Sequence, residues 1–289
     1  MSACPLCTSA AANWTKLGPF TIDQCSRCLH RFVAEVPVRS HIADVYDDAY
    51  FNGGGAGYTN YLAQRELLCS RGKWYGELVK RLTGGSAGRV LDVGAAAGFL
   101  LSGWKQAGWQ SVGIEPNRSM TLEAAKLGLD VRCGAFESET FFEEASFDCV
   151  AMIQVISHLV DPRLAIAKAY HLLRPGGVLL VETWDRGSVI ARLLGKGWHE
   201  YSPPSVLHWF TRAGLQQVMV QSGFEPIGSR RALRWIHVGH AKSILQHSAK
   251  KSLVYTGVSS IMKILPSAWS LPYPGDDLFW ALYRKPVRP

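Results

Sequence analysis

The fold is decided by the stretch VLDVGAAAGF, residues 90–99, which is followed by a second apolar run, SVGI, residues 111–114. Each run is short enough for a buried strand, and a small-residue turn and a helix-like stretch lie between them. Glu115 directly follows the second run. A tight turn before a helix lets a ligand bind to backbone N–H groups at the helix N-terminus. The acid is placed to accept hydrogen bonds from two ribose hydroxyls, so the sequence predicts an adenosine-containing cofactor.

The turn after the first strand has the pattern D-x-G-x-x-x-G, with Asp92, Gly94 and Gly98 at its fixed positions. This pattern fits the dinucleotide-binding sequence G-x-G-x-x-G poorly. It resembles motif I of class I S-adenosylmethionine-dependent methyltransferases, usually D-V-G-C-G-T-G. Ala96 replaces the middle glycine of that motif, which limits how closely the backbone can approach a cofactor. A Rossmann turn that binds nothing is the alternative.

Later segments follow the order of the same fold. We predict a buried strand at residues 147–152, a helix at 164–173 and another strand at 178–182, with the helix breaker RPGG at 174–177. This order resembles strands four and five of the methyltransferase fold with the helix between them. The resemblance covers about residues 86 to 225 and implies an α/β fold with a Rossmann-like, seven-stranded class I methyltransferase sheet.

Four cysteines near the beginning of the chain form two C-x2-C pairs. They are Cys4, Cys7, Cys25 and Cys28. This spacing is typical of a tetrahedral zinc site, and because four thiolates close the coordination shell we expect the zinc to be structural. Two disulfides or unrelated thiols are the alternatives, and we see no secretion signal that would favour disulfides. Cys133 and Cys149 lie in apolar, strand-like contexts, so we expect both to be buried core thiols.

The whole chain resembles a bacterial group of class I methyltransferases that carry an N-terminal zinc ribbon and modify sugars, glycolipids or secondary metabolites. Its landmarks are the cysteine pairs, a Y-D-x-x-Y-F segment at 46–51 and a W-x-x-Y-x-P-P-x-x-L-x-x-F segment at 198–210. We therefore expect three parts. They are a zinc ribbon at 1–36, a linker and N-terminal helical cap at 37–85, and a methyltransferase domain at 86–289 with a basic insertion at about 228–275.

The resemblance implies roles for several residues in binding S-adenosylmethionine. Asp92, Gly94 and Gly98, with Ala96 between them, would hold the methionine end, and Glu115 would hold the ribose. Ala135 and Phe136 would contact the adenine, and Gln154 and Val155 would face the sulfonium and the substrate. Quinone O-methyltransferases carry a metal-binding E-x-x-E-H at the positions of Gln154, Ser157 and His158. Both carboxylates are missing here, so no catalytic metal is expected.

Three histidines are candidates for a general base, which a hydroxyl acceptor would need. His199 and His208 lie in the 198–210 segment on the expected substrate side. His158 follows strand four and is either a base or a hydrogen-bonded structural residue. Four aromatic residues of the same segment either line an apolar pocket or belong to the core. They are Trp198, Tyr201, Trp209 and Phe210.

Charge is concentrated near the end of the chain of 289 residues. Residues 226–289 carry ten basic residues and two acids, a surplus equal to the formal net charge of +8 of the whole chain. Such a surplus suits an anionic acceptor, an anionic membrane surface or RNA, or is a solvated surface. An apolar stripe at 244–265 predicts a substrate-lid helix or a helix lying on a membrane. We find no long apolar run and no signal peptide, so we expect a cytoplasmic protein.

These observations favour an S-adenosylmethionine-dependent methyltransferase that acts on a hydroxyl, or another nucleophile, of a small-molecule, sugar or glycolipid acceptor. The first alternative is an RNA base methyltransferase, which the basic C-terminal part permits. The second is a non-catalytic cofactor-binding protein, suggested only by Ala96. The sequence identifies neither the acceptor nor the oligomeric state.

Overall fold

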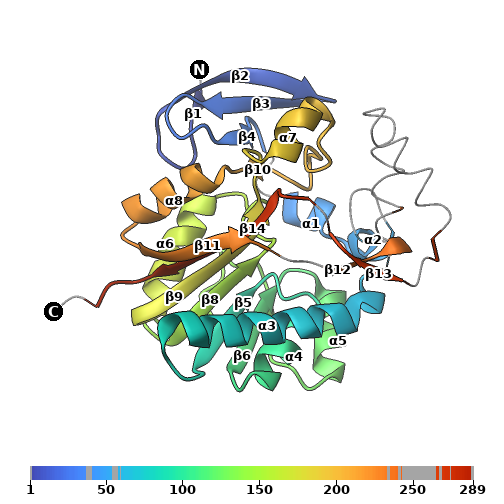
Figure 1. Ribbon diagram of the computed structural model, residues 1–289, viewed down its shortest axis with the longest axis vertical. Helices are drawn as coiled ribbons and strands as arrows, with labels where there is room; N and C mark the ends of the chain where they lie inside the picture. Colours follow the sequence, from blue (N-terminus) through green and yellow to red (C-terminus); the bar gives the residue numbers. More distant parts are fainter. Residues whose placement is uncertain are drawn as a thin grey trace.

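The computed structural model describes residues 2–36, 41–53, 58, 60–232, 235–239, 242, 265–266, 269–273 and 275–287. It contains a large central sheet with helices on both faces and a second, smaller sheet built mainly from the N-terminal segment (Figure 1). A short two-stranded sheet, β12 (Trp235–His237) with β13 (Ser270–Pro272), lies apart from both.

The central sheet has seven strands in the order β11-β14-β9-β8-β5-β6-β7. Their bounds are Arg89–Val93 (β5), Gln110–Glu115 (β6), Val131–Cys133 (β7), Phe147–Ile153 (β8), Leu173–Trp184 (β9), Glu225–Arg231 (β11) and Leu278–Arg284 (β14). Strand β14 runs antiparallel to both of its neighbours, and the remaining pairs are parallel. The predicted α/β class with a seven-stranded, Rossmann-like sheet is confirmed.

Helices pack on both faces of this sheet (Figure 1). The longer ones are α3 (Arg65–Thr83), α4 (Phe99–Gln106), α5 (Arg118–Lys126), α6 (Pro162–Leu172) and α8 (Arg212–Gln221). Shorter ones are α1 (His41–Val45), α2 (Asp48–Phe51), α7 (Val189–Leu194) and the 3-10 turns η1 (Leu62–Gln64) and η2 (Gly195–Gly197). Gly84 ends α3 in the left-handed conformation with φ of 64°, which only glycine adopts without a steric cost.

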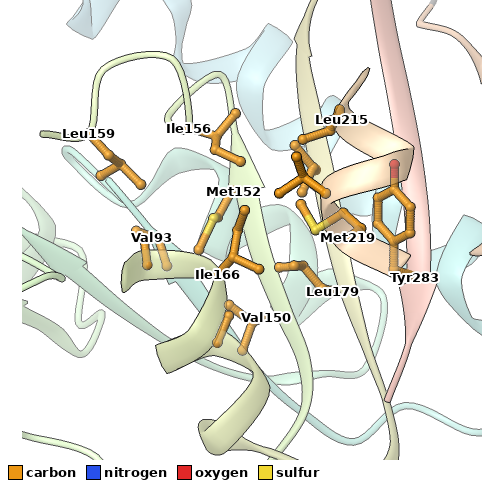
Figure 2. Packing of buried hydrophobic residues seen from close by; sticks show 14 of the residues in the cluster. Val93, Val150, Met152, Ile156, Leu159, Ile166, Leu179, Leu215, Met219 and Tyr283 are labelled. Carbon is orange, nitrogen blue, oxygen red and sulfur yellow. The ribbon is translucent and has the colours of Figure 1, made fainter. Parts of the chain in front are cut away.

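The alternation of side chains along β8 divides the core into two layers. Val150 and Met152 point to the face covered by α6 and α8, where Figure 2 shows them beside Ile166, Leu215 and Met219. Cys149, Ala151 and Ile153, which alternate with them along β8, point to the opposite face, against α3 and α4. Because β8 is buried on both faces, all of its residues except Asp148, near its start, are apolar.

The two cysteines expected in the core differ. Cys149 lies in the middle of β8 and is fully buried, as predicted. The prediction for Cys133 is wrong, because this residue ends β7 at the edge of the sheet and its side chain is exposed. An edge strand has neighbours on one side only, so apolar flanking residues do not ensure burial.

The smaller sheet joins the N-terminal segment to the second half of the chain. Its strands lie in the order β1-β2-β3-β4-β10 and are antiparallel. Four of them come from the first 36 residues, namely β1 (Ser2–Ala3), β2 (Ala10–Leu17), β3 (Phe20–Cys25) and β4 (Arg31–Val33). The fifth, β10 (His208–Trp209), comes from the segment after α7. The cysteine-bearing segment and the methyltransferase part are therefore joined by a shared sheet.

The C-terminal part departs from the expected boundaries. Strand β11 continues to Arg231, so the central sheet includes the first residues of the range expected for the basic insertion. The helix expected at 244–265 lies almost entirely outside the described residues. Within the described part of the chain, no helix is both long and apolar enough to cross a membrane.

Candidate functional site

A pocket opens at the carboxyl ends of the parallel strands. Gly94 follows β5, Glu115 ends β6, and Gln154 follows β8, and all three line this pocket. The carboxyl ends of parallel strands share one edge of a sheet, which is where open α/β sheets bind their ligands. The structure thus brings together residues that are far apart in the sequence and that we expected to contact a cofactor.

The turn after β5 has a backbone that needs small residues. Gly94, Ala96 and Gly98 all have positive φ, at 70°, 46° and 75°. A Cβ atom on Gly94 would lie 2.6 Å from a methyl carbon of Val155, so a larger residue cannot fit there without displacing the pocket wall. Ala96 shows that the middle position accepts a Cβ atom in this turn. Gly94 lines the pocket, so the absence of a side chain at this position lets a ligand lie close to the backbone.

Two buried carboxyl groups lie at this strand edge. Glu115 accepts hydrogen bonds from the backbone N–H groups of Ala96 and Asn117, both at 2.9 Å. Burial raises the pKa of Glu115 to about 7, although these two N–H groups oppose the shift. Burial, reinforced by the negative charge of Glu115, raises the pKa of Asp92 to about 8.

The carboxyl group of Asp92 is buried and can still accept hydrogen bonds. Neither of its carboxyl oxygens has a hydrogen-bond partner among the described residues, and the residue is only 1% exposed. Buried polar atoms are nearly always hydrogen-bonded in folded proteins. Asp92 and Glu115 together would suit a ligand that offers hydroxyl or amino donors, such as ribose and the amino group of S-adenosylmethionine.

A group of aromatic side chains forms a second part of the pocket wall. They come from the short helices and the following residues, and they are Tyr46, Tyr50, Phe51, Tyr58 and Tyr61. The rings mostly meet edge to face at centroid distances of 5.0 to 6.0 Å. Asn117 holds this wall by donating to the carbonyl of Tyr46 at 3.0 Å and to Asp48 at 3.1 Å. We did not predict these residues as site residues, although the Y-D-x-x-Y-F landmark contains three of them.

Arg71 was also not predicted. It lies on α3, lines the pocket and pairs with the buried carboxylate of Glu182, which also accepts a hydrogen bond from Tyr75. An arginine on the apolar face of a helix, between Leu68 and Tyr75, was the signal that could have identified it. It is the one lysine or arginine among the described residues that line the pocket.

Of the three candidate histidines, His158 lines the pocket. Gln154 and Val155, which we expected to face the cofactor, line it as well. Its Nδ1 lies 2.7 Å from the backbone carbonyl oxygen of Ser205. Because a carbonyl oxygen only accepts, Nδ1 carries the proton, and Nε2 of the neutral ring is left as an acceptor. Burial lowers the pKa of His158, which favours this neutral form. Tyr46 also contacts this group, since its hydroxyl donates to the same carbonyl at 2.7 Å.

The other two candidate histidines do not line this pocket. His208 is buried against His30, with 3.0 Å between His30 Nε2 and His208 Nδ1, and burial lowers its pKa to about 4. His199 packs edge-on against Trp184, and its Nε2 lies 3.4 Å from a carboxylate oxygen of Glu200.

The four aromatic residues of the 198–210 segment are core residues. They are Trp198, Tyr201, Trp209 and Phe210, each at most 4% exposed, and none of them lines the pocket. Of the two interpretations that the sequence left open for them, packing is the one that the structure supports.

The cysteines form a compact cluster beside the shared sheet. Cys4, Cys7, Cys25 and Cys28 place their sulfur atoms within 4.8 Å of one another. Three of the sulfur pairs lie 3.5 to 3.7 Å apart. Tetrahedral zinc with Zn–S bonds of about 2.3 Å separates its sulfurs by about 3.8 Å, so the cluster has a suitable size. The backbone N–H groups of Arg27 and Cys28 point at the Cys25 sulfur, at 3.3 and 3.4 Å, which would stabilise a thiolate.

Comparison with protein families gives a match to the methyltransferase domain over residues 61–228. The chain belongs to the methyltransferase domain family. The match begins just before α3 and ends within β11, so it includes the turn after β5, both buried carboxyl groups and His158.

Curated relatives of this methyltransferase include ubiquinone biosynthesis O-methyltransferases. The enzyme from Nitrobacter winogradskyi is 29% identical over 168 residues, which cover 50% of this chain and 63% of the relative. The enzyme from Xylella fastidiosa is 31% identical over 170 residues, which cover 51% of this chain and 69% of the relative. The chain thus spans about two thirds of the length of these relatives.

Solved structures show the same fold. A SAM-dependent methyltransferase from Thermotoga maritima aligns with a TM-score of 0.52 at 20% identity, covering 79% of this chain and 92% of the other. One from Archaeoglobus fulgidus aligns with a TM-score of 0.50 at 16% identity, covering 76% and 94%. At these identities the likeness concerns the fold alone.

Proposed function

We propose that this protein is an S-adenosylmethionine-dependent methyltransferase that transfers a methyl group to a hydroxyl of a small-molecule acceptor. The observation that carries the proposal is a pocket lined by the buried carboxyl group of Glu115 and by Gly94 and Ala96 of the small-residue turn. The buried carboxyl group of Asp92 lies on the neighbouring strand, directly before this turn. When bound, S-adenosylmethionine supplies an activated methyl group on a positively charged sulfur. Family membership and the curated O-methyltransferase relatives support the same reaction type.

Residues at the strand edge would bind the cofactor. Glu115 would accept hydrogen bonds from the ribose hydroxyls, as its position at the end of β6 favours. Asp92, which has no partner among the described residues, would accept from donors at the methionine end. Ala135 and Phe136 line the pocket next to Glu115 and would contact the adenine. Arg71 also lines the pocket, and its positive charge is matched by the carboxylate of Glu182.

His158 would act as the general base. Its Nδ1–H is held by the Ser205 carbonyl, so Nε2 is the nitrogen that can receive the proton of the acceptor hydroxyl as its oxygen bonds to the methyl carbon. The carbon–sulfur bond breaks in the same displacement, and its electron pair stays on sulfur. The proton on His158 is then released to solvent, because burial disfavours the charged ring.

The aromatic wall indicates the kind of acceptor. Tyr46, Tyr50 and Tyr58 line the pocket, and Arg71 is paired with Glu182. Such a lining favours a largely apolar or planar acceptor over a free phosphate. This feature favours a small molecule over an RNA base, and the relatives named for ubiquinone biosynthesis agree with it. The zinc that the cysteine cluster fits would be structural.

The test replaces His158 by Asn and measures transfer of a labelled methyl group from S-adenosylmethionine to a panel of hydroxylated aromatic compounds. Asn can keep the contact to the Ser205 carbonyl but lacks the atom equivalent to Nε2. We expect kcat to fall about 10²- to 10⁴-fold while cofactor affinity stays unchanged. His171→Asn, at an exposed position on α6, is the matched control. Wild-type turnover by the His158 variant would show that His158 is not the base.

A further inference from the structure

The segment from Ser205 to Trp209, which we call the strap, lies between two parts of the chain. One is the cysteine ribbon, residues 2–36 with strands β1 to β4, and the other is the loop after β8 that carries His158. On the ribbon side it forms β10, which pairs with β4 so that His208 lies opposite Phe32 and Trp209 opposite Arg31. The N–H of Val33 donates to the Leu207 carbonyl at 3.0 Å. The ribbon therefore holds the strap by backbone hydrogen bonds on one edge.

The same strap holds the loop after β8 on its other side. The N–H groups of Leu207 and His208 both donate to the carbonyl of Ser157, at 2.9 and 3.0 Å. Ser157 directly precedes His158, whose ring is fixed by the Ser205 carbonyl at 2.7 Å. Both the backbone and the ring of this part of the loop are thus set by atoms of the strap.

Buried side chains pack around these contacts. Leu207 and Trp209 are 1% and 2% exposed and share one apolar cluster with Ile22 and Val33 of the ribbon strands. The imidazoles of His30 and His208 stack with 5.2 Å between ring centroids and share a hydrogen bond at 3.0 Å. His30 belongs to the connection between Cys28 and β4, so this pair joins the ribbon to the strap next to the cysteine cluster.

We infer that the cysteine ribbon is a positioning element for catalysis: through the His30–His208 pair and the strap it fixes the location and the tautomer of His158. His208 is then a positioning residue that does not touch the acceptor. This inference rests on the role proposed above for His158. The described ribbon strands pair with one another and with the strap. The inference therefore assigns the ribbon a role in the reaction and not a separate binding function.

The test compares His208→Leu with His208→Asn. Leu removes the hydrogen bond to His30, whereas the Asn side chain can place a polar atom where Nδ1 lies. We expect His208→Leu to lower kcat by about tenfold or more, since small displacements of a catalytic group have large effects on rate, with little change in cofactor KM. His208→Asn should recover most of the rate, and His171→Leu, on the exposed face of α6, should behave as wild type.

A second readout does not depend on turnover. Histidine side chains labelled with ¹⁵N report which ring nitrogen carries the proton, and the His158→Asn variant identifies the His158 signals. We expect Nδ1 to be protonated in the wild type and in His208→Asn, and a mixture of tautomers in His208→Leu. Unchanged His158 signals in a folded His208→Leu variant would overturn the inference, whatever reaction the enzyme catalyses.

The wild-type chain provides the same test should His208→Leu fail to fold. A chelator is added in steps to protein loaded with zinc, and metal content and the His158 signals are followed together. The inference predicts that the His158 signals change in proportion to zinc loss. Signals that stay fixed while zinc leaves would contradict it. Failure of the wild type to transfer a methyl group to any acceptor tested, with His158 signals that still respond, would instead contradict the proposed function alone.

Discussion

Asp92 and Glu115 are buried carboxyl groups at the ends of two neighbouring parallel strands, and the charge on Glu115 adds to the burial that raises the pKa of Asp92 to about 8. The pKa of Glu115 is itself raised, to about 7. In the ligand-free protein, the carboxyl groups of Asp92 and Glu115 are therefore partly protonated near neutral pH. A ligand that is positively charged or rich in donors would favour the ionised forms, and this describes S-adenosylmethionine.

The stability of the ligand-free protein should fall as the pH rises from about 4 to about 8. In the unfolded chain Asp92 has its ordinary pKa of 3.8, so between these limits the folded protein holds a proton that the unfolded chain has lost. Each such group changes the free energy of unfolding by up to about 1.4 kcal/mol per pH unit. Urea unfolding at several pH values should give a shallower dependence for Asp92→Asn than for the wild type. Equal slopes would mean that Asp92 is ionised in the folded protein.

Removing one cysteine of the cluster should affect the whole molecule. Cys25 is fully buried and packs in the same apolar cluster as Phe210 and Leu215 of the methyltransferase part. We expect Cys25→Ser to lose zinc and to lower the melting temperature of the main unfolding transition. For zinc at a thousand times its Kd, the lost stabilisation would be about 4 kcal/mol. Cys133→Ser, at an exposed position, should keep about one zinc per chain by elemental analysis. Protein purified without chelator that contains no zinc would refute the site.

The basic residues near the end of the chain should affect the KM of the acceptor only if the acceptor is anionic. Arg230 and Arg231 are exposed on the edge strand β11, and exposed charges contribute little to stability. If the acceptor is anionic, changing both to Gln should raise its KM and weaken the salt dependence, with an unchanged melting temperature. Arg81→Gln, exposed on α3, is the control. An unchanged KM at low salt identifies a solvated surface, and RNA binding with a steep salt dependence would favour the RNA alternative.

The sequence predicted those parts of the structure that rest on local patterns. The turn from Asp92 to Gly98, the acid at Glu115 and the strand at 147–152 each carry a signal within a few residues, and the fold that they indicate is confirmed. The cysteine pairs likewise predicted a cluster because their spacing is itself the constraint.

Contacts between distant segments could not be predicted in this way. Strand β10 has two residues, which are too few to show a periodic pattern. The sequence therefore did not predict that β10 pairs with β4, or that the segment containing it contacts His158. His199 and His208 were candidates because their segment lies on the expected substrate side, yet the pocket is lined by His158. The burial of Cys133 was misjudged because the strand order, and hence the edge position, is a property of the whole sheet.

The central claim is best tested by calorimetric titration of the purified protein with S-adenosylmethionine, for the wild type and for Glu115→Gln. We predict one binding site per chain in the wild type. Gln removes the negative charge and one acceptor position, and hydrogen bonds to charged groups contribute about 1.5–3 kcal/mol each, so the variant should bind at least about tenfold more weakly. Glu143→Gln, at an exposed position far along the chain from the motif, should bind as the wild type does. No binding by the wild type, or equal affinity of wild type and Glu115→Gln, would contradict the account.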